Sequence, residues 1–220
     1  MSLSVDYVKN GFALVPIPLG SKGPVLPGWN LPENAVTTVD AAANITGNMG
    51  ILHMHCKDPT ASIDLDDQEA ATKLLSDAGV DINLLLRAQD AVQISSGRPN
   101  RAKLLYRLPE LLSSLETIQI ADPASGAMIV EFRSASKGGT SVTDVLPPSI
   151  HPKTGKPYIW AGSGHWSELP ELPPVLLNYW KQQLEEKEHK QHKNVINAEL
   201  DSVTTLPPES VQHLRGALLH

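Results

Sequence analysis

The pattern of apolar and polar positions changes near residue 90. Up to that point, stretches with apolar residues three or four positions apart alternate with short apolar runs, which predicts helices interleaved with strands. The expected helices cover residues 5–10, 39–44 and 68–77, and the expected strands cover residues 12–17, 49–53 and 61–65. A Pro- and Gly-rich loop follows the first strand. The last two of these strands and the helix after them are predicted to form one α/β unit.

Beyond residue 90, short alternating runs are separated by turn residues, which is typical of an antiparallel sheet. The expected strands cover residues 91–95, 103–108, 117–121, 127–133 and 141–145. A last helix is expected from residue 173 to about residue 190, because apolar residues recur there at helical spacing. The chain therefore combines helices and strands in one folded region.

The C-terminal end differs in composition from the rest of the chain. We expect a folded domain over residues 1–185 and a charged and polar linker over residues 186–208. Residues 209–220 again show apolar positions at helical spacing, but they provide only about three turns, which is too short for a stable isolated helix. They are expected to begin a further helical domain that the chain truncates.

Composition excludes several classes of protein. Apolar residues make up 41% of the chain and charged residues 19%, and no apolar stretch approaches the roughly 18 residues of a membrane-spanning helix. The N-terminus lacks the basic start and long apolar core of a secretory signal, so a cytoplasmic location is expected. Cys56 is the only cysteine, which excludes an intramolecular disulfide and a thiolate zinc site.

Charge is distributed unevenly. The net charge of −6 argues against a protein that coats nucleic acid by electrostatic attraction alone. Residues 95–165 nevertheless hold eight Lys or Arg residues against five acids. A site for a polyanion is therefore expected in the middle of the chain.

The segment SIDLDD provides the strongest chemical signal. Side chains alternate between the two faces of a strand, so Asp64 and Asp66 share one face while Ile63 and Leu65 point into the core. Two converging carboxylates repel each other unless a cation lies between them, and Mg²⁺ and Mn²⁺ prefer such oxygen ligands. The alternative is an ordinary strand end at which Asp66 or Asp67 caps the next helix.

Two further segments carry charge on predicted strands or turns. SSGRPNRAKLLYR places Arg98, Arg101 and Lys103 around a turn, which suits a phosphate but is also found in ordinary basic hairpins. IVEFRS places Glu131 and Arg133 on one strand face. If this strand lies beside that of Asp64, Glu131 completes a cluster of three carboxylates; otherwise the pair lies on an exposed, salt-bridged face.

Histidines supply the remaining candidates. In LPPSIHPKTGKPYIW, Ser149 and His151 point the same way if the backbone is extended, and such a pair can contact a triphosphate or a ribose. A proline-rich surface loop is the alternative. His53 and His55 also alternate, but without a third nearby ligand a pair at the end of a strand explains them better than a metal site.

In this order, the segments resemble the primase-polymerase domain of the archaeo-eukaryotic primase superfamily over about residues 5–180. Asp64 and Asp66 resemble its first motif and Glu131 its third. Residues 147–160 are similar to its PPS-x-H loop with a following Y-x-W, and an early loop with Lys22, Pro24 and Trp29 is similar to its lysine-proline and Gly-Trp pattern. The second motif differs: Ser96 and Gly97 are followed by Lys103 where the family usually has a histidine.

The resemblance implies an α+β fold, in which a small N-terminal α/β part is fused to an antiparallel RRM-like sheet with the active-site cleft between them. It implies template-directed nucleotidyl transfer, that is DNA primase and DNA polymerase activity in plasmid, phage or mobile-element replication. Asp64, Asp66 and Glu131 would be the catalytic ligands of two Mg²⁺ or Mn²⁺ ions. The nucleotide-binding residues would be Ser96, Arg101, Lys103, Arg133, Ser149 and His151.

The partners implied are nucleoside triphosphates, a single-stranded DNA template and a helicase region after residue 220. Two other functions remain open. Because the family's histidine is absent, the domain is alternatively a catalytically degenerate module of a replication initiator that binds nucleotide or single-stranded DNA. Paired acids also suit phosphodiester hydrolysis by a metal-dependent nuclease.

Overall fold

The computed structural model describes residues 2–204 of the chain, and side chains as far as residue 197. The chain divides into two compact units, Met1–Tyr179 and Trp180–His220. The first unit has a mixed α/β architecture in which all strand pairs of its two sheets are antiparallel. Among the described residues, no helix combines the length and the apolar composition that a membrane crossing requires.

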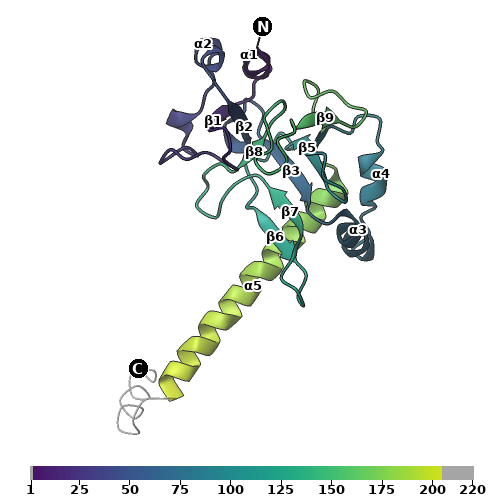
Figure 1. Ribbon diagram of the computed structural model, residues 1–220. Coiled ribbons are helices and arrows are strands. Elements are labelled where there is room, and N and C mark those ends of the chain that lie inside the picture. Colours follow the sequence, from purple (N-terminus) through teal and green to yellow (C-terminus); the bar gives the residue numbers. More distant parts are fainter. Residues whose placement is uncertain (1, 205–220) are drawn as a thin grey trace. The chain divides into compact units, whose positions relative to one another are not determined.

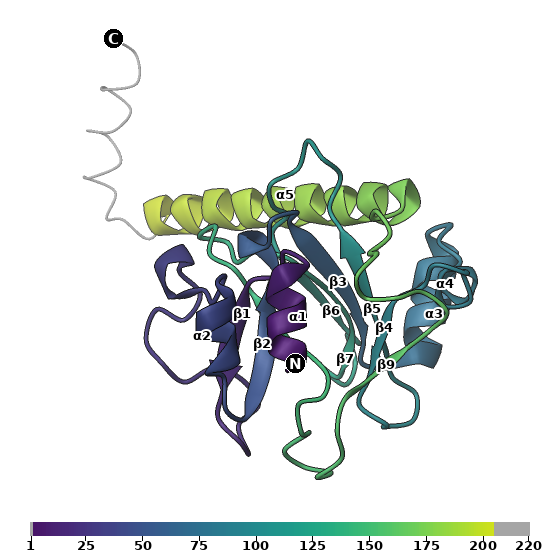
Figure 2. The same ribbon diagram turned by 90° about the horizontal axis from the view of Figure 1, so that it is seen from above.

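The smaller sheet has three strands in the order β1-β2-β8. These are β1 (Leu14–Ile17), β2 (Asn48–Leu52) and β8 (Thr143–Val145). Helices α1 (Leu3–Lys9) and α2 (Val39–Ala43) lie beside this sheet (Figures 1 and 2). Every residue of β2 is buried, so this strand belongs to the core.

The larger sheet has six strands in the order β6-β7-β3-β5-β4-β9. They are β3 (Thr60–Leu65), β4 (Gln93–Ser95), β5 (Ala102–Arg107), β6 (Ile118–Ala121), β7 (Met128–Arg133) and β9 (Ile159–Ala161). Helices α3 (Gln68–Asp77) and α4 (Ile82–Leu86) lie beside this sheet (Figure 2). Ile63 and Leu65 of β3 are fully buried, as their alternation predicts.

An aromatic cluster connects α1 to the later loops. Tyr7 is fully buried, and its hydroxyl donates to the carbonyl oxygen of Pro147 (2.8 Å) while accepting the indole N–H of Trp160 (2.7 Å). The ring of Trp166 packs edge-on against Tyr7 at 4.7 Å between centroids. The N-terminal helix therefore holds in place the loop that leads to His151.

Gly50 allows strand β8 to approach β2 closely. A Cβ at this position would press on the Thr143 hydroxyl and lie 3.0 Å from the carbonyl oxygen of Asp144. Gly50 pairs with Val145, and Ile51 pairs with Asp144. Glycine here thus sets the position of the strand that carries Asp144.

A short loop is fixed to the start of α3. Asp67 is the N-cap, and its carboxylate accepts from Ala70 N and from the side-chain amide of Asn100, both at 2.9 Å. Asn100 also accepts from Glu69 N (3.0 Å) and adopts φ +56°, a left-handed conformation that asparagine tolerates. These bonds hold the basic turn between β4 and β5 against the helix.

Most predicted elements are confirmed, and the helix expected over 68–77 has those bounds. The assignment of the strands near 49–53 and 61–65 to one α/β unit is wrong, because β2 and β3 lie in different sheets. The short 3-10 helix His53–His55 and the residues after it redirect the chain between them. Helix α4 and strand β9 were not predicted, since each is too short for its periodicity to be recognised.

The last helix, α5 (Pro174–Thr204), extends well beyond the expected end near residue 190 and covers most of the segment interpreted as a linker. Its first turns belong to the first unit, where the Tyr179 ring packs against Phe132 of β7 at 5.6 Å between centroids. The helical segment expected over residues 209–220 lies outside the described residues. The RRM-like character of the larger sheet stays a prediction.

Candidate active site

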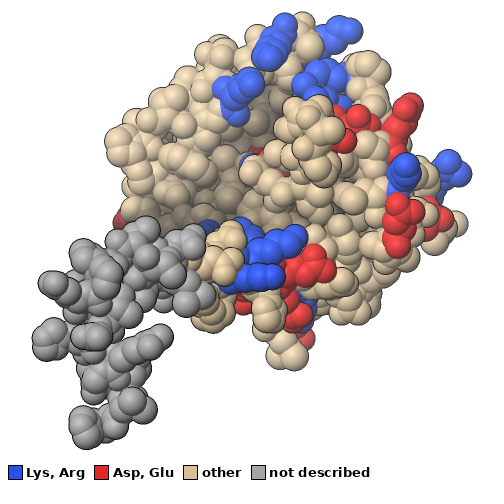
Figure 3. Space-filling view, turned by 90° about the horizontal axis from the view of Figure 1, so that it is seen from below, with Lys and Arg blue, Asp and Glu red and all other residues tan. Residues whose placement is uncertain are grey.

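A polar pocket of about 240 Å³ opens in the first unit, lined by residues from both sheets and from three loops. Five of the lining residues are cations, namely Lys22, Arg98, Lys103, Arg133 and Lys153. Asp64 and Asp144 supply its carboxylates. Figure 3 shows Lys and Arg side chains gathered along the upper rim of a hollowed face. The excess of positive charge suits a polyanionic ligand.

Three charged residues form a row across the centre of the larger sheet. Asp64 of β3 pairs with Lys103 of β5 on one side and with Glu131 of β7 on the other. Directly opposed residues in an antiparallel pair lie close, with Cβ atoms about 5 Å apart. Lys103 Nζ lies 3.0 Å from Asp64 Oδ2, and Arg133 forms an ion pair with Glu131. Two carboxylates thus lie side by side on one face, with Lys103 next to Asp64 and Arg133 next to Glu131.

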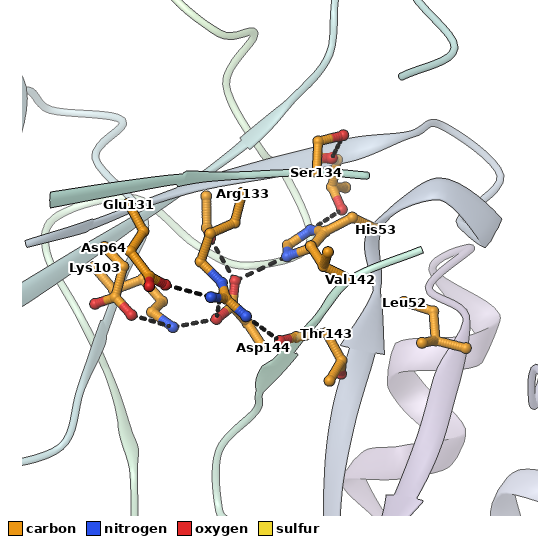
Figure 4. A network of polar contacts seen from close by, with 12 residues as sticks. Leu52, His53, Asp64, Lys103, Glu131, Arg133, Ser134, Val142, Thr143 and Asp144 are labelled. Atoms are coloured by element: carbon orange, nitrogen blue, oxygen red, sulfur yellow. Dashed lines mark hydrogen bonds and ion pairs between the residues drawn. The ribbon is translucent and has the colours of Figure 1, made fainter. Parts of the chain in front are cut away.

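Asp144 reaches this row from the other sheet (Figure 4). Its Oδ1 contacts Lys103 Nζ and lies 3.3 Å from Arg133 Nε. Its Oδ2 accepts from the Ser62 hydroxyl and lies 2.8 Å from His53 Nε2. The side chain of Asp144 is only 2% exposed, so this carboxylate is a buried anion surrounded by donors.

The charges around Asp144 determine its ionisation. Burial alone would raise the pKa of this carboxyl, but Lys103, Arg133 and the His53 hydrogen bond together hold the pKa well below its ordinary value. For Lys103, burial would lower the pKa, but the carboxylates of Asp144 and Asp64 outweigh it and the pKa lies above its ordinary value. Asp144 is therefore ionised and Lys103 protonated at neutral pH.

His53 is fully buried, and burial lowers its pKa despite the neighbouring Asp144 carboxylate. The imidazole is therefore neutral at pH 7. An ionised carboxylate only accepts hydrogen bonds, so the proton lies on Nε2 and points to Asp144. Nδ1, 2.8 Å from the Thr60 hydroxyl, is then the acceptor of that hydroxyl proton. His53 accordingly orients Asp144.

The free energy of unfolding is expected to fall less between pH 7 and pH 5.5 in a His53→Gln variant than in the wild-type protein. The unfolded chain protonates His53 near pH 6.5, whereas the folded protein holds this pKa lower. Between the two values the unfolded state binds more protons, so the free energy of unfolding falls as pH falls, by at most about 1.4 kcal/mol per pH unit for one histidine. Urea unfolding at pH 7 and pH 5.5 measures the slope; equal slopes for both proteins would contradict the prediction.

His151 also presents a defined tautomer. Its Nδ1 accepts from the backbone N–H groups of Lys153 and Thr154, both at 3.2 Å, so the proton of the neutral ring lies on Nε2. Burial and the nearby charges of Arg98, Lys153 and Lys22 lower its pKa. This residue lines the pocket. It can therefore donate a neutral hydrogen bond to a ligand there.

The structure brings together some of the residues predicted for nucleotide binding. Lys103, Arg133 and His151 line the large pocket, while Ser96 and Arg101 line a smaller pocket of about 70 Å³ that shares Asp64 and Lys103 with it. Ser149 behaves differently. Its hydroxyl accepts from Met49 N (2.9 Å) and donates to Met49 O (3.1 Å), so it holds the loop to β2. Its hydroxyl is thus committed to the backbone.

The three predicted metal ligands do not gather. Asp64 and Glu131 are adjacent, but Asp66 follows the end of β3 and forms an ion pair with Arg101. Within residues 2–197, no group of three or more His, Cys, Asp or Glu side chains is arranged to hold a metal ion. The donor chemistry of Asp64 and Glu131 nevertheless fits a hard divalent cation. Asp66 would join them only by leaving Arg101.

Sequence reasoning missed Asp144 and the role of His53. The available signal was an acid alternating with valine in a short predicted strand, SVTDV, and no role was assigned to this acid. His53 and His55 do not form a metal-binding pair, because His55 Nε2 instead lies 2.9 Å from the carbonyl oxygen of Asn30. Tyr158, which lines both pockets, was also not singled out for this role.

Comparison with protein families gives a match over most of the chain. The model of a family described as bifunctional DNA primase/polymerase, N-terminal (Prim-Pol), matches residues 4–175. The matched range includes the charged row, Asp144 and all residues of the large pocket. A search of curated proteins found no match.

Proposed function

The chain belongs to the bifunctional DNA primase/polymerase N-terminal family, and from this premise we propose that its pocket binds a nucleoside triphosphate for template-directed nucleotidyl transfer. The family match points to primase or polymerase activity in general. The observation that carries the finer proposal is the carboxylate of Asp64 at the edge of a pocket lined by five cations. This arrangement suits an attack on a phosphate beside a binding site for the remaining phosphates.

The residues divide into two sets of roles. Lys103 and Arg133 would bind the phosphates by charge-assisted hydrogen bonds, and Lys22, Arg98 and Lys153 would add attraction from the rim. His151 would donate from its neutral ring to a phosphate or sugar oxygen. Asp64 with Glu131 would hold Mg²⁺ or Mn²⁺, together with Asp66 once it is released from Arg101. When bound, such ions stabilise the attacking and leaving oxygens of the transfer.

The proposal extends to a single-stranded DNA template and to replication of a plasmid, phage or other mobile element, with a helicase region as partner. These are implied by the family resemblance. The smaller pocket, which Ser96 and Arg101 line, adjoins the charged row. We propose that the template lies on this side of the triphosphate site.

A second function is favoured by one contact. Lys103 Nζ lies 3.0 Å from Asp64 Oδ2, so the Lys103 ammonium lies close to Asp64, which is a proposed metal ligand. If Lys103 keeps this place, the domain would bind nucleotide or single-stranded DNA without polymerising it. This alternative predicts binding that does not depend on a divalent metal.

The deciding experiment is incorporation of labelled nucleotides on a single-stranded DNA template, with and without a primer, in Mg²⁺ and in Mn²⁺. Both ribo- and deoxynucleotides are supplied. Extension of the primer that needs the metal is the expected result, and product in the primer-free reaction would add primase activity. Nucleotide binding without any product would overturn the polymerase proposal in favour of the binding module. Shortening of the labelled strand would instead indicate a nuclease.

A further inference from the structure

The carboxylate of Asp144 has two oxygens with different partners. Oδ2 is held by groups of the protein core, the His53 ring and the Ser62 hydroxyl. Oδ1 faces the two cations, Lys103 and Arg133. One oxygen thus contacts groups of the core, and the other contacts the two cationic groups (Figure 4).

The two cations reach the pocket from different strands of the larger sheet, whereas Asp144 comes from the smaller one. Their side chains are partly exposed, 16% for Lys103 and 22% for Arg133, while that of Asp144 is 2% exposed. A ligand in the pocket therefore meets mainly the cations, because very little of the Asp144 side chain is exposed although the residue is part of the lining. Asp144 is thus expected to influence a ligand chiefly through the two cations.

Both cations keep donors for a ligand. A lysine ammonium has three N–H groups, and the contacts with Asp64 and Asp144 use two of them. Arg133 donates from Nη1 to Glu131 and from Nη2 to the carbonyl oxygen of Thr143 at 3.0 Å, while its buried Nε lies 3.3 Å from Asp144 Oδ1 as an ion pair without a hydrogen bond. Nη1 and Nη2 each carry a second N–H group, so two donors remain for a ligand.

Long, flexible side chains lose rotamer freedom when they bind a ligand. If the fold already holds such a side chain in place, binding no longer carries this entropic cost.

We propose that Asp144 is the positioning residue of the phosphate-binding pocket, and that its buried carboxylate holds the charged ends of Lys103 and Arg133 ready for the triphosphate. This inference rests on the proposed function, because it assumes that the pocket takes a nucleoside triphosphate. It concerns neither metal binding nor the transfer step. The expected consequence is a change in affinity and KM rather than in kcat.

The test compares Asp144→Asn with the wild-type protein, using dATP and inorganic tripolyphosphate as probes in calorimetric titrations. The variant keeps the shape and an acceptor for His53 but turns an amide toward the cations. We expect both probes to bind at least about tenfold more weakly. Without the carboxylate, Lys103 and Arg133 are no longer held where they form charge-assisted hydrogen bonds to phosphate. In incorporation assays KM for dATP should rise by a similar factor while kcat changes less than about threefold. A loss for dATP without a loss for tripolyphosphate would overturn the proposal.

Two further variants separate positioning from general damage to the core. Ser134→Ala removes another buried hydroxyl, which donates to Thr60 O at 3.2 Å, and contacts neither cation; it should bind both probes like the wild type. In a Lys103→Met background, Asp144→Asn should cost less affinity than in the wild type, since one of the groups it positions is absent. An equal loss in both backgrounds would show that Asp144 acts elsewhere.

The outcomes also separate this inference from the proposed function. A wild-type protein that binds neither probe overturns both. Wild-type binding that Asp144→Asn leaves unchanged overturns the inference alone. If Asp144→Asn does not fold by circular dichroism, His53→Leu takes its place, because it removes the N–H group that donates to Oδ2 and leaves the charge of Asp144. Several-fold weaker binding of tripolyphosphate supports the proposal, and unchanged binding overturns it.

Discussion

Replacement of Asp64 by Asn is expected to lower nucleotide incorporation by about a thousandfold or more in a protein that remains folded. Asp64 lies at the centre of the charged row, opposite both Lys103 and Glu131, and it lines both pockets. An amide is a poor ligand for the proposed metal ion and carries no charge to attract it. Single-turnover extension of a labelled primer measures the rate.

The stability of this variant should change little. The Asp64 side chain is 26% exposed, and Lys103 retains Asp144 as a partner, so the lost ion pair contributes about 1 kcal/mol or less. The control is Asp77→Asn, the same chemical change at an exposed acid at the end of α3, which should leave incorporation at the wild-type rate. An Asp64→Asn protein that extends primers within tenfold of the wild-type rate would rule out Asp64 as a catalytic residue.

The second large effect is expected for Lys103→Met, which keeps the length of the side chain and removes its charge. Affinity for dATP should fall by about 10- to 100-fold, since one charge-assisted contact to phosphate contributes about 1.5–3 kcal/mol. The free energy of unfolding should fall by about 2–3 kcal/mol, at the low end for breaking a buried ion pair, because Arg133 still faces Asp144. Titration calorimetry and urea unfolding measure the two effects.

Lys156 provides the matched control for this substitution. It is exposed and is absent from the lining of the described pockets, so Lys156→Met should bind dATP and unfold like the wild type. If Lys103→Met bound dATP as tightly as Lys156→Met, the pocket would not take phosphate at Lys103. If Lys103→Met were less stable but bound dATP with the wild-type affinity, Lys103 would contribute to folding and not to nucleotide binding.

Alternation along strands was sufficient to place several candidate residues on the correct face. Asp64, Glu131 and Arg133 were predicted to project from strand faces that lack the apolar residues, and they do so. Side-chain period in a strand is a local property of the backbone, so it can be read from the sequence. That Asp64 lies opposite Glu131 was stated only as a condition, because it depends on which strands pair.

Local reasoning failed where a strand ends or the backbone turns. Asp66 was expected to join Asp64 and Glu131, but β3 ends at Leu65, and the Asp66 carboxylate forms an ion pair with Arg101. Ser149 was expected to project with His151 from an extended segment. A turn in which Ser149 N donates to Leu146 O (3.0 Å) directs its hydroxyl to Met49 instead.

The sequence by itself determined most of the helices and strands, the carboxylates and cations available for chemistry, and the family resemblance that the match over residues 4–175 confirms. These depend on spacing and residue type, which are local. Only the tertiary structure decided which charges meet. Asp144 contacts Lys103 and Arg133 because β8 joins the smaller sheet beside Gly50. Such contacts depend on the strand register and on the packing of one sheet against the other. No single segment of the sequence specifies either of these.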